Sequence, residues 1–218
     1  MSTSTALETL ASARLIADYA ERLGVERSPT TPRAENSHLG AVLADSVLQA
    51  GVNYTAVVRV RINRILTIYP DAATLSGLKA VIRDRSTSDF LQWTHPTKIS
   101  RFVLLMAFFD NEAIENTIDL KRWLSLNKAR DKLLSLNGVG PKTYDYMCCL
   151  IGIDCIAVDR HIKTFVREAG IPLEDYDSLK TVVSCAADLL GLPRRDFDAW
   201  IWGMISQRTH SAFQYQLF

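Results

Sequence analysis

The sequence predicts an all-α fold of about ten helices. Apolar residues recur at helical spacing through almost the whole chain of 218 residues. Glycine, proline and helix-capping residues separate these periodic segments. The apolar runs at 57–62 and 146–153 resemble strands, but both lie inside longer helical patterns. A hydrophobic content of 48% is enough for one large domain or two small interdigitated ones.

Residues 1–36 are predicted to hold one helix followed by a connector. The helix covers 6–24 and stops at Gly24, and the stretch 27–37 is rich in turn-forming residues. The remainder, residues 37–218, forms the main domain, and we expect the N-terminal helix to pack against the C-terminal helices.

Nine further helices are predicted within the main domain. Pro70 ends one of them, and Asp71 is the expected N-cap of the next. Pro96 and Pro141 suit first helical positions, where a missing N–H group is no loss. The predicted helices are 38–51, 54–70, 71–85, 96–109, 127–136, 141–153, 160–170, 175–191 and 195–207.

The charge distribution suggests a polyanionic partner although the chain's net charge is only +1. Residues 57–101 carry eight Lys/Arg against three Asp/Glu, and residues 119–167 carry nine against five. A basic central region with acidic ends can present a positive face to phosphates. Chance clustering of charges on a solvated surface is the alternative.

The N-terminal segment and the cysteines point to a cytoplasmic protein. The first 24 residues mix acidic and basic side chains and lack an uninterrupted apolar core, so neither a signal peptide nor a membrane span is expected. The four cysteines fit no metal-ligand spacing, and free thiols are the expected state. They are Cys148, Cys149, Cys155 and Cys185.

The stretch 136–143 predicts a turn between two helices that can hold a phosphate. Gly138 and Gly140 allow backbone conformations closed to other residues. The amide groups of Gly138, Gly140, Lys142 and Thr143 are then expected to point outward at a helix N-terminus, which favours anions. Such a site contacts a nucleic-acid backbone without reading its sequence. A plain corner between two helices is the alternative reading.

Lys142 and Asp159 open two successive predicted helices. The helix dipole disfavours the ammonium form of Lys142 at an N-terminus. Asp159 is a good N-cap for the helix at 160–170, and capping alone would explain its presence. Capping does not explain why a lysine and an aspartate both stand at helix starts, where each can project into a cleft.

This arrangement resembles the helix-hairpin-helix DNA glycosylases, the superfamily of endonuclease III and 8-oxoguanine glycosylase. The likeness rests on the hairpin 127–151, with "LNGVGPKTY" at 136–144, and on the loop 156–161, with "VDRH" at 158–161. Weaker similarity covers about residues 38–210. Asn137 and Tyr144 depart from the family's proline and alanine, and the C-terminal cysteines of an iron–sulfur cluster are missing from this sequence.

The resemblance implies two helical subdomains with a cleft between them and excision of a damaged base from DNA. A lysine at position 142 resembles the bifunctional enzymes, in which the amine attacks the anomeric carbon of the sugar and the resulting Schiff base permits β-elimination. Asp159 would accept the amine's proton or stabilise the cationic sugar. A glycosylase without the lyase step and a non-catalytic DNA-binding module remain the alternatives.

Further residues take expected roles by the same resemblance. Gln49 would fill the space left by the extruded base, and His161 would fix the Asp159 loop or contact a phosphate. Tyr146, four residues after Lys142, would stack on that base or serve as a core aromatic. Further aromatic residues either line the lesion pocket or pack in the core: Trp200, Trp202 and Phe213.

The expected partner is double-stranded DNA with a damaged base, bound by a monomer that contacts no membrane. In a bacterium the protein would associate with the nucleoid. The resemblance implies no required cofactor and no iron–sulfur cluster. It also places a bound Na⁺ or K⁺ at the hairpin, held by the backbone carbonyls of Leu134, Leu136 and Val139. Which lesion is excised does not follow from the sequence.

Overall fold

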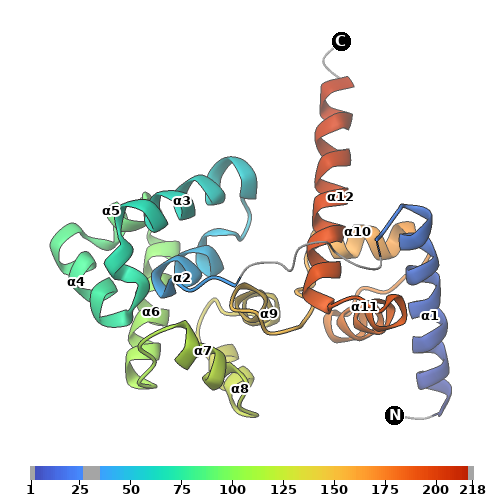
Figure 1. The fold of residues 1–218 in the computed structure, drawn as a ribbon, viewed down its shortest axis with the longest axis horizontal. Coiled ribbons are helices and arrows are strands. Elements are labelled where there is room, and N and C mark those ends of the chain that lie inside the picture. Colours follow the sequence, from blue (N-terminus) through green and yellow to red (C-terminus); the bar gives the residue numbers. More distant parts are fainter. Residues whose placement is uncertain (1–2, 27–34, 216–218) are drawn as a thin grey trace. The chain divides into compact units, whose positions relative to one another are not determined.

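The computed structural model describes residues 3–26 and 35–215, with side chains for 6–26 and 35–208, and within these ranges it is helical without strands, as predicted (Figure 1). The chain forms two compact units. Unit 1 combines residues 1–33 with 154–218, and unit 2 comprises residues 34–153. Most of the expected connector, residues 27–34, lies outside the described residues.

Unit 1 is built from α1 (Thr3–Arg22), α10 (Arg160–Glu168), α11 (Tyr176–Leu190) and α12 (Arg194–Tyr215). Helix α1 buries the stripe Ala13, Ile16, Ala17 and Ala20, whose spacing places all four on one helical face. This stripe joins a core that includes Val183 of α11, so the first helix packs with the last part of the chain.

Unit 2 is arranged around α2 (Leu39–Leu48), every residue of which is buried. Helices α3 (Arg59–Ile68), α6 (Pro96–Asn111) and α9 (Pro141–Leu150) contact it (Figure 1). A helix that is buried on all sides needs such surroundings. Gly40 allows the backbone at Ala72 to approach α2 closely, because a side chain at position 40 would meet the carbonyl of Ala72.

The remaining elements of unit 2 pack on one another and on the helices around α2. A π-helical turn at Tyr54–Val58 leads into α3, and a 3₁₀ turn at Pro70–Ala73 precedes α4 (Leu75–Arg85). Three shorter helices follow further along the chain. They are α5 (Thr87–Leu91), α7 (Thr117–Leu124) and α8 (Ala129–Leu134).

Several predicted helix ends are confirmed, and one is wrong. Pro96 and Pro141 are the first residues of α6 and α9, and Asp159 is the N-cap of α10. Asp71 does not cap α4. Thr74 does, because its backbone is extended and its hydroxyl accepts from the amide of Gly77 at 3.1 Å.

The helices α5 and α7 were not predicted. Helix α5 has only five residues, too few for a periodic apolar pattern. Helix α7 has a recognisable start, because the Asn116 side chain accepts from the amides of Ile118 and Asp119. Within the described residues no helix is long and apolar enough to cross a bilayer.

Candidate functional site

The turn at residues 135–140 joins α8 to α9 in unit 2, and we call it the α8–α9 turn. The amide of Val139 donates to the carbonyl of Leu136 at 3.1 Å and closes the turn. Gly138 has φ +86°, a left-handed conformation that favours glycine. Gly140 is the N-cap of α9, with φ −103°, and a side chain there would meet open space.

The N-terminus of α9 has no side-chain cap. Gly140 offers no side chain, and no side chain of the described residues caps this helix. The first-turn amides of an α-helix have no acceptor within the helix, and the helix dipole makes this end favourable for an anion. Lys142 and Thr143 lie in this first turn, and both side chains are half-buried.

Arg101 of α6 lies against the α8–α9 turn. The sequence predicted the turn but not this contact. A side chain at Gly138 would come within 2.1 Å of the Arg101 Nε atom, so the arginine occupies the space beside the glycine. In the part of the chain that the structure describes, no carboxylate pairs with Arg101. The turn therefore combines a helix N-terminus without a side-chain cap and a guanidinium.

Tyr146 joins α9 to the centre of unit 2. Its hydroxyl donates to Asp45 Oδ1 at 3.0 Å, and Tyr54 donates to Asp45 Oδ2 at 2.9 Å. Asp45 is 2% exposed, so the two phenols solvate a buried carboxylate. Burial, and then the negative charge of Asp45, raises the pKa of Tyr146 well above its ordinary value. Tyr146 therefore anchors α9 on α2, and stacking of its ring on a base stays a prediction.

Gln49 stands at the C-terminal end of α2. Its backbone amide donates to the carbonyl of Asp45 at 3.1 Å, and its side chain is half-buried. The side-chain amide makes no hydrogen bond with the described part of the chain. The ammonium of Lys98 donates to the carbonyls of Leu48 and Ala50, on either side of Gln49.

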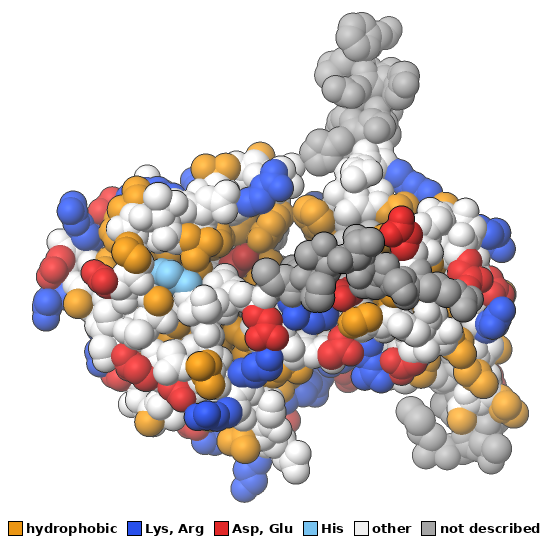
Figure 2. Space-filling model, viewed as in Figure 1, with side chains coloured by type: hydrophobic (Ala, Val, Ile, Leu, Met, Phe, Trp, Pro, Cys, Tyr) orange, Lys and Arg blue, Asp and Glu red, His pale blue; other side chains and the backbone are white. Residues whose placement is uncertain are grey.

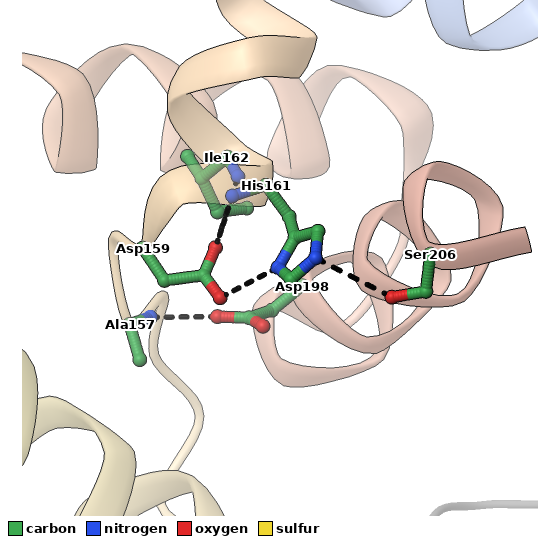
Figure 3. Close-up of polar contacts among 6 residues, drawn as sticks. All are labelled: Ala157, Asp159, His161, Ile162, Asp198 and Ser206. Carbon is green, nitrogen blue, oxygen red and sulfur yellow. Dashed lines mark hydrogen bonds and ion pairs between the residues drawn. The ribbon is translucent and has the colours of Figure 1, made fainter. Parts of the chain in front are cut away.

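Asp159 lies in unit 1, where it opens α10 (Figure 3). Its Oδ1 atom accepts from the amides of His161 at 2.7 Å and Ile162 at 3.0 Å, and Oδ2 contacts His161 Nδ1 at 2.9 Å. The capping role that the sequence left open is therefore real. These N–H groups also hold the carboxylate in one orientation and stabilise its negative charge.

His161 extends this arrangement toward α12 (Figure 3). An ionised carboxylate can only accept, so Nδ1 of His161 carries the proton in its contact with Asp159. The Nε2 atom then faces the hydroxyl of Ser206 at 3.5 Å. His161 is 9% exposed, and the Trp202 ring lies edge-on to it at 5.8 Å. The position fits the fixing of the Asp159 loop that the sequence suggested.

Two further aspartates hold the segment that leads to Asp159. The amide of Ala157 donates to Asp198 Oδ2 at 2.6 Å, which ties the segment to α12 (Figure 3). The amide of Arg195 donates to Asp154 Oδ1 at 3.0 Å. The sequence analysis missed both residues, because their partners lie 41 positions away and leave no local pattern.

The two tryptophan candidates of α12 contact different groups of residues. Trp200 stacks on Phe197 at 6.0 Å and meets Phe165 edge-on at 5.8 Å, so it packs against the core of unit 1. Trp202 contacts His161 and belongs to the Asp159 group. Phe213 lies outside the residues whose side chains are described.

The proposed cation ligands lie at or beside the α8–α9 turn. One of the three carbonyls, that of Leu136, already accepts from Val139, which leaves it one lone pair for an ion. A Na⁺ or K⁺ ion there stays a prediction.

No group of three or more His, Cys, Asp or Glu in the described residues is arranged for a metal ion. All four cysteines are free thiols, as the sequence suggested.

The departures from the family pattern are accommodated locally. The Tyr144 hydroxyl donates to the carbonyl of Leu124 at 3.0 Å, so this tyrosine connects α9 to the end of α7. Asn137 is exposed.

The two central candidates belong to different units, Lys142 to unit 2 and Asp159 to unit 1. No protein-family model, curated protein or solved structure matches the chain.

Proposed function

We propose that the chain is a base-excision DNA glycosylase with AP-lyase activity. It binds duplex DNA, extrudes a damaged nucleotide and removes the base. The observation that carries the proposal is the uncapped start of α9, where two glycines, Lys142 and Arg101 gather at one turn. Asp159, held by three N–H contacts, supports it independently.

Phosphate binding is the first step. The α8–α9 turn is a helix-hairpin-helix motif in this proposal, and its amides and the Arg101 guanidinium grip the backbone. Gln49 enters the space that the extruded base leaves, and extrusion costs a few kcal/mol, least for a damaged base. The unused side-chain amide of Gln49 supports this role.

Nucleophilic attack follows. The neutral amine of Lys142 forms a bond to C1′ of the sugar while the glycosidic bond breaks and the base departs with its electron pair. Asp159 stabilises the positive charge that develops on the sugar. The nitrogen then loses a proton, the C1′–O4′ bond of the sugar ring breaks, and O4′ takes up a proton, which leaves an open-chain protonated Schiff base. Removal of a C2′ proton from this Schiff base expels the 3′ phosphate.

Borohydride trapping tests the proposal. Duplexes that each carry one oxidised purine or pyrimidine are incubated with the protein and reduced, and a covalent adduct is expected with at least one of them. The adduct should disappear in Lys142→Gln and persist in Lys121→Gln, whose lysine pairs with Glu35 in unit 2.

The other outcomes separate the alternatives. Excision without an adduct would show a glycosylase that activates water instead of Lys142. Binding of duplex DNA with neither excision nor an adduct would leave a DNA-binding module, and the enzymatic proposal would be wrong.

A further inference from the structure

We infer that Lys98 is a positioning residue for Gln49, the side chain that replaces the extruded base. The inference rests on the proposed function. It starts from the end of α2, whose last carbonyls have no donor within the helix. The ammonium of Lys98 donates hydrogen bonds to two carbonyls in this region. One belongs to Leu48, and the other, at 2.8 Å, belongs to Ala50.

The two carbonyls flank Gln49 along the chain. Holding both peptide groups fixes the backbone of the residue between them, so its side chain leaves α2 in a set direction. A cation at a helix C-terminus is also favourable for the helix dipole. The backbone of Gln49 is thereby fixed, while its side-chain amide makes no hydrogen bond with the described residues.

Lys98 is itself held in place. Its ammonium lies 4.7 Å from the centre of the Trp93 ring, which also packs with the guanidinium of Arg61 at 5.2 Å. The backbone of Trp93 is bound to Ser88, through its amide at 3.1 Å and its carbonyl at 2.8 Å. The chain of contacts therefore runs from α5 and α3 through Trp93 to Lys98 and the end of α2.

Lys98 lies in a basic neighbourhood. Burial, and then the positive charge of Arg101 one helical turn further along α6, lowers the pKa of Lys98. No carboxylate of the described residues pairs with Arg61, Lys98 or Arg101. Two of the three donors of Lys98 are used on carbonyls, which favours positioning over a direct phosphate contact.

The test measures single-turnover excision from a lesion duplex for Lys98→Met, Gln49→Ala and the double variant. Methionine keeps the apolar stem against Trp93 and removes the donors. We expect Lys98→Met to lower the rate about tenfold, as the loss of one net hydrogen bond would. In the Gln49→Ala background the same change should have almost no further effect, because Lys98 acts through Gln49.

Three controls accompany this cycle. Lys98→Arg keeps the donors and should restore most of the rate. Lys79→Met removes the same charge from an exposed ion pair with Asp110 and should excise normally. Borohydride trapping on a single-stranded abasic site needs no base extrusion, so Lys98→Met should react there like the wild type. Thermal melting checks that each variant folds.

The outcomes are distinguishable. If the wild type neither excises nor traps, the proposed function and this inference both fall. If the wild type excises, equal losses from Lys98→Met with and without Gln49 overturn the inference alone. A fall of about one in the log–log salt slope of duplex binding by Lys98→Met would also overturn it, because that change marks a direct phosphate contact.

Discussion

At the scale of single residues, Asp159 combines an N-cap with a side-chain contact to His161. Its Oδ1 atom caps α10, and Oδ2 contacts His161. The sequence identified the residue and the helix start, because Asp before a helical pattern is a strong N-cap signal. It did not identify Asp198, whose partner is 41 positions away, or Asp45, which has one partner 101 positions away and another nine positions away.

The first prediction separates the capping role of Asp159 from its proposed chemical role. Asparagine caps helices as well as aspartate does but carries no charge, so Asp159→Asn should melt near the wild type. Its excision rate should fall about 100-fold or more, since charge stabilisation is lost. Asp175→Asn provides the matched control, because Asp175 caps α11 in the same unit through the amide of Ser178. Equal excision by both variants would remove Asp159 from the mechanism.

The second prediction concerns pH and Tyr146. Its pKa is raised on folding, so the neutral phenol is favoured in the folded state. Below about pH 10 the folded and unfolded states both keep the proton, and the contribution to stability is complete. Above that pH the unfolded state loses the proton first, and the free energy of unfolding falls.

Urea unfolding across pH 7–11 measures this effect. Tyr146→Phe should cost about 1–3 kcal/mol at pH 7, because the buried carboxylate of Asp45 loses a donor. Its stability should then fall less steeply than the wild type above pH 10. Tyr19→Phe, which removes an exposed bond to Glu168, should keep the wild-type slope. Parallel curves for the wild type and Tyr146→Phe would contradict the prediction.

At the scale of elements, helix positions were more predictable than the contacts that give them function. Local signals such as Pro96, Pro141 and Gly24 mark helix ends correctly because the physics of a helix end is local. The cap of α4 was misplaced because Asp71 and Thr74 are both good caps, and only the 3₁₀ turn between them decides. The approach of Arg101 to Gly138 joins two helices, so no local pattern indicates it.

The third prediction tests the α8–α9 turn. Gly138→Ala should destabilise the protein by about 1–3 kcal/mol, since alanine resists positive φ and would displace Arg101. Duplex binding should weaken with it. Gly140→Ala meets open space at a negative φ and should change stability by about 0.5 kcal/mol or less. Urea unfolding and binding titrations measure both variants, and equal destabilisation would show that the turn conformation is wrong.

At the scale of the whole molecule, charge is distributed more evenly than the sequence windows suggested. On the face drawn in Figure 2, Lys and Arg side chains are interspersed with Asp and Glu. Many cations of the basic windows have acidic partners, as in the pairs Lys79–Asp110, Lys121–Glu35 and Lys132–Glu112. Counting Lys and Arg along the sequence therefore overstates the number of cations available to a phosphate. Arg101, which pairs with no carboxylate of the described residues, indicates a phosphate-binding position better than the charge totals of residues 57–101 and 119–167 do.

The fourth prediction tests the division into two units. Ile16 is fully buried in the core of unit 1, whereas its neighbour Leu15 is 53% exposed. Ile16→Asp should cost about 3–5 kcal/mol, and Leu15→Asp should be nearly neutral. In Ile16→Asp, hydrogen exchange should show that the amides of α11 lose protection while the amides of α2 stay protected. Loss of protection in both helices would show that the units unfold together.

The split composition of unit 1 has a consequence for biosynthesis. Helix α1 ends at Arg22, and its partner α11 begins at Tyr176, after the whole of unit 2 has been translated. Unit 2 can thus fold on the ribosome as it emerges, because its residues are contiguous. The apolar stripe of α1 therefore lacks its native partner until α11 has been synthesised.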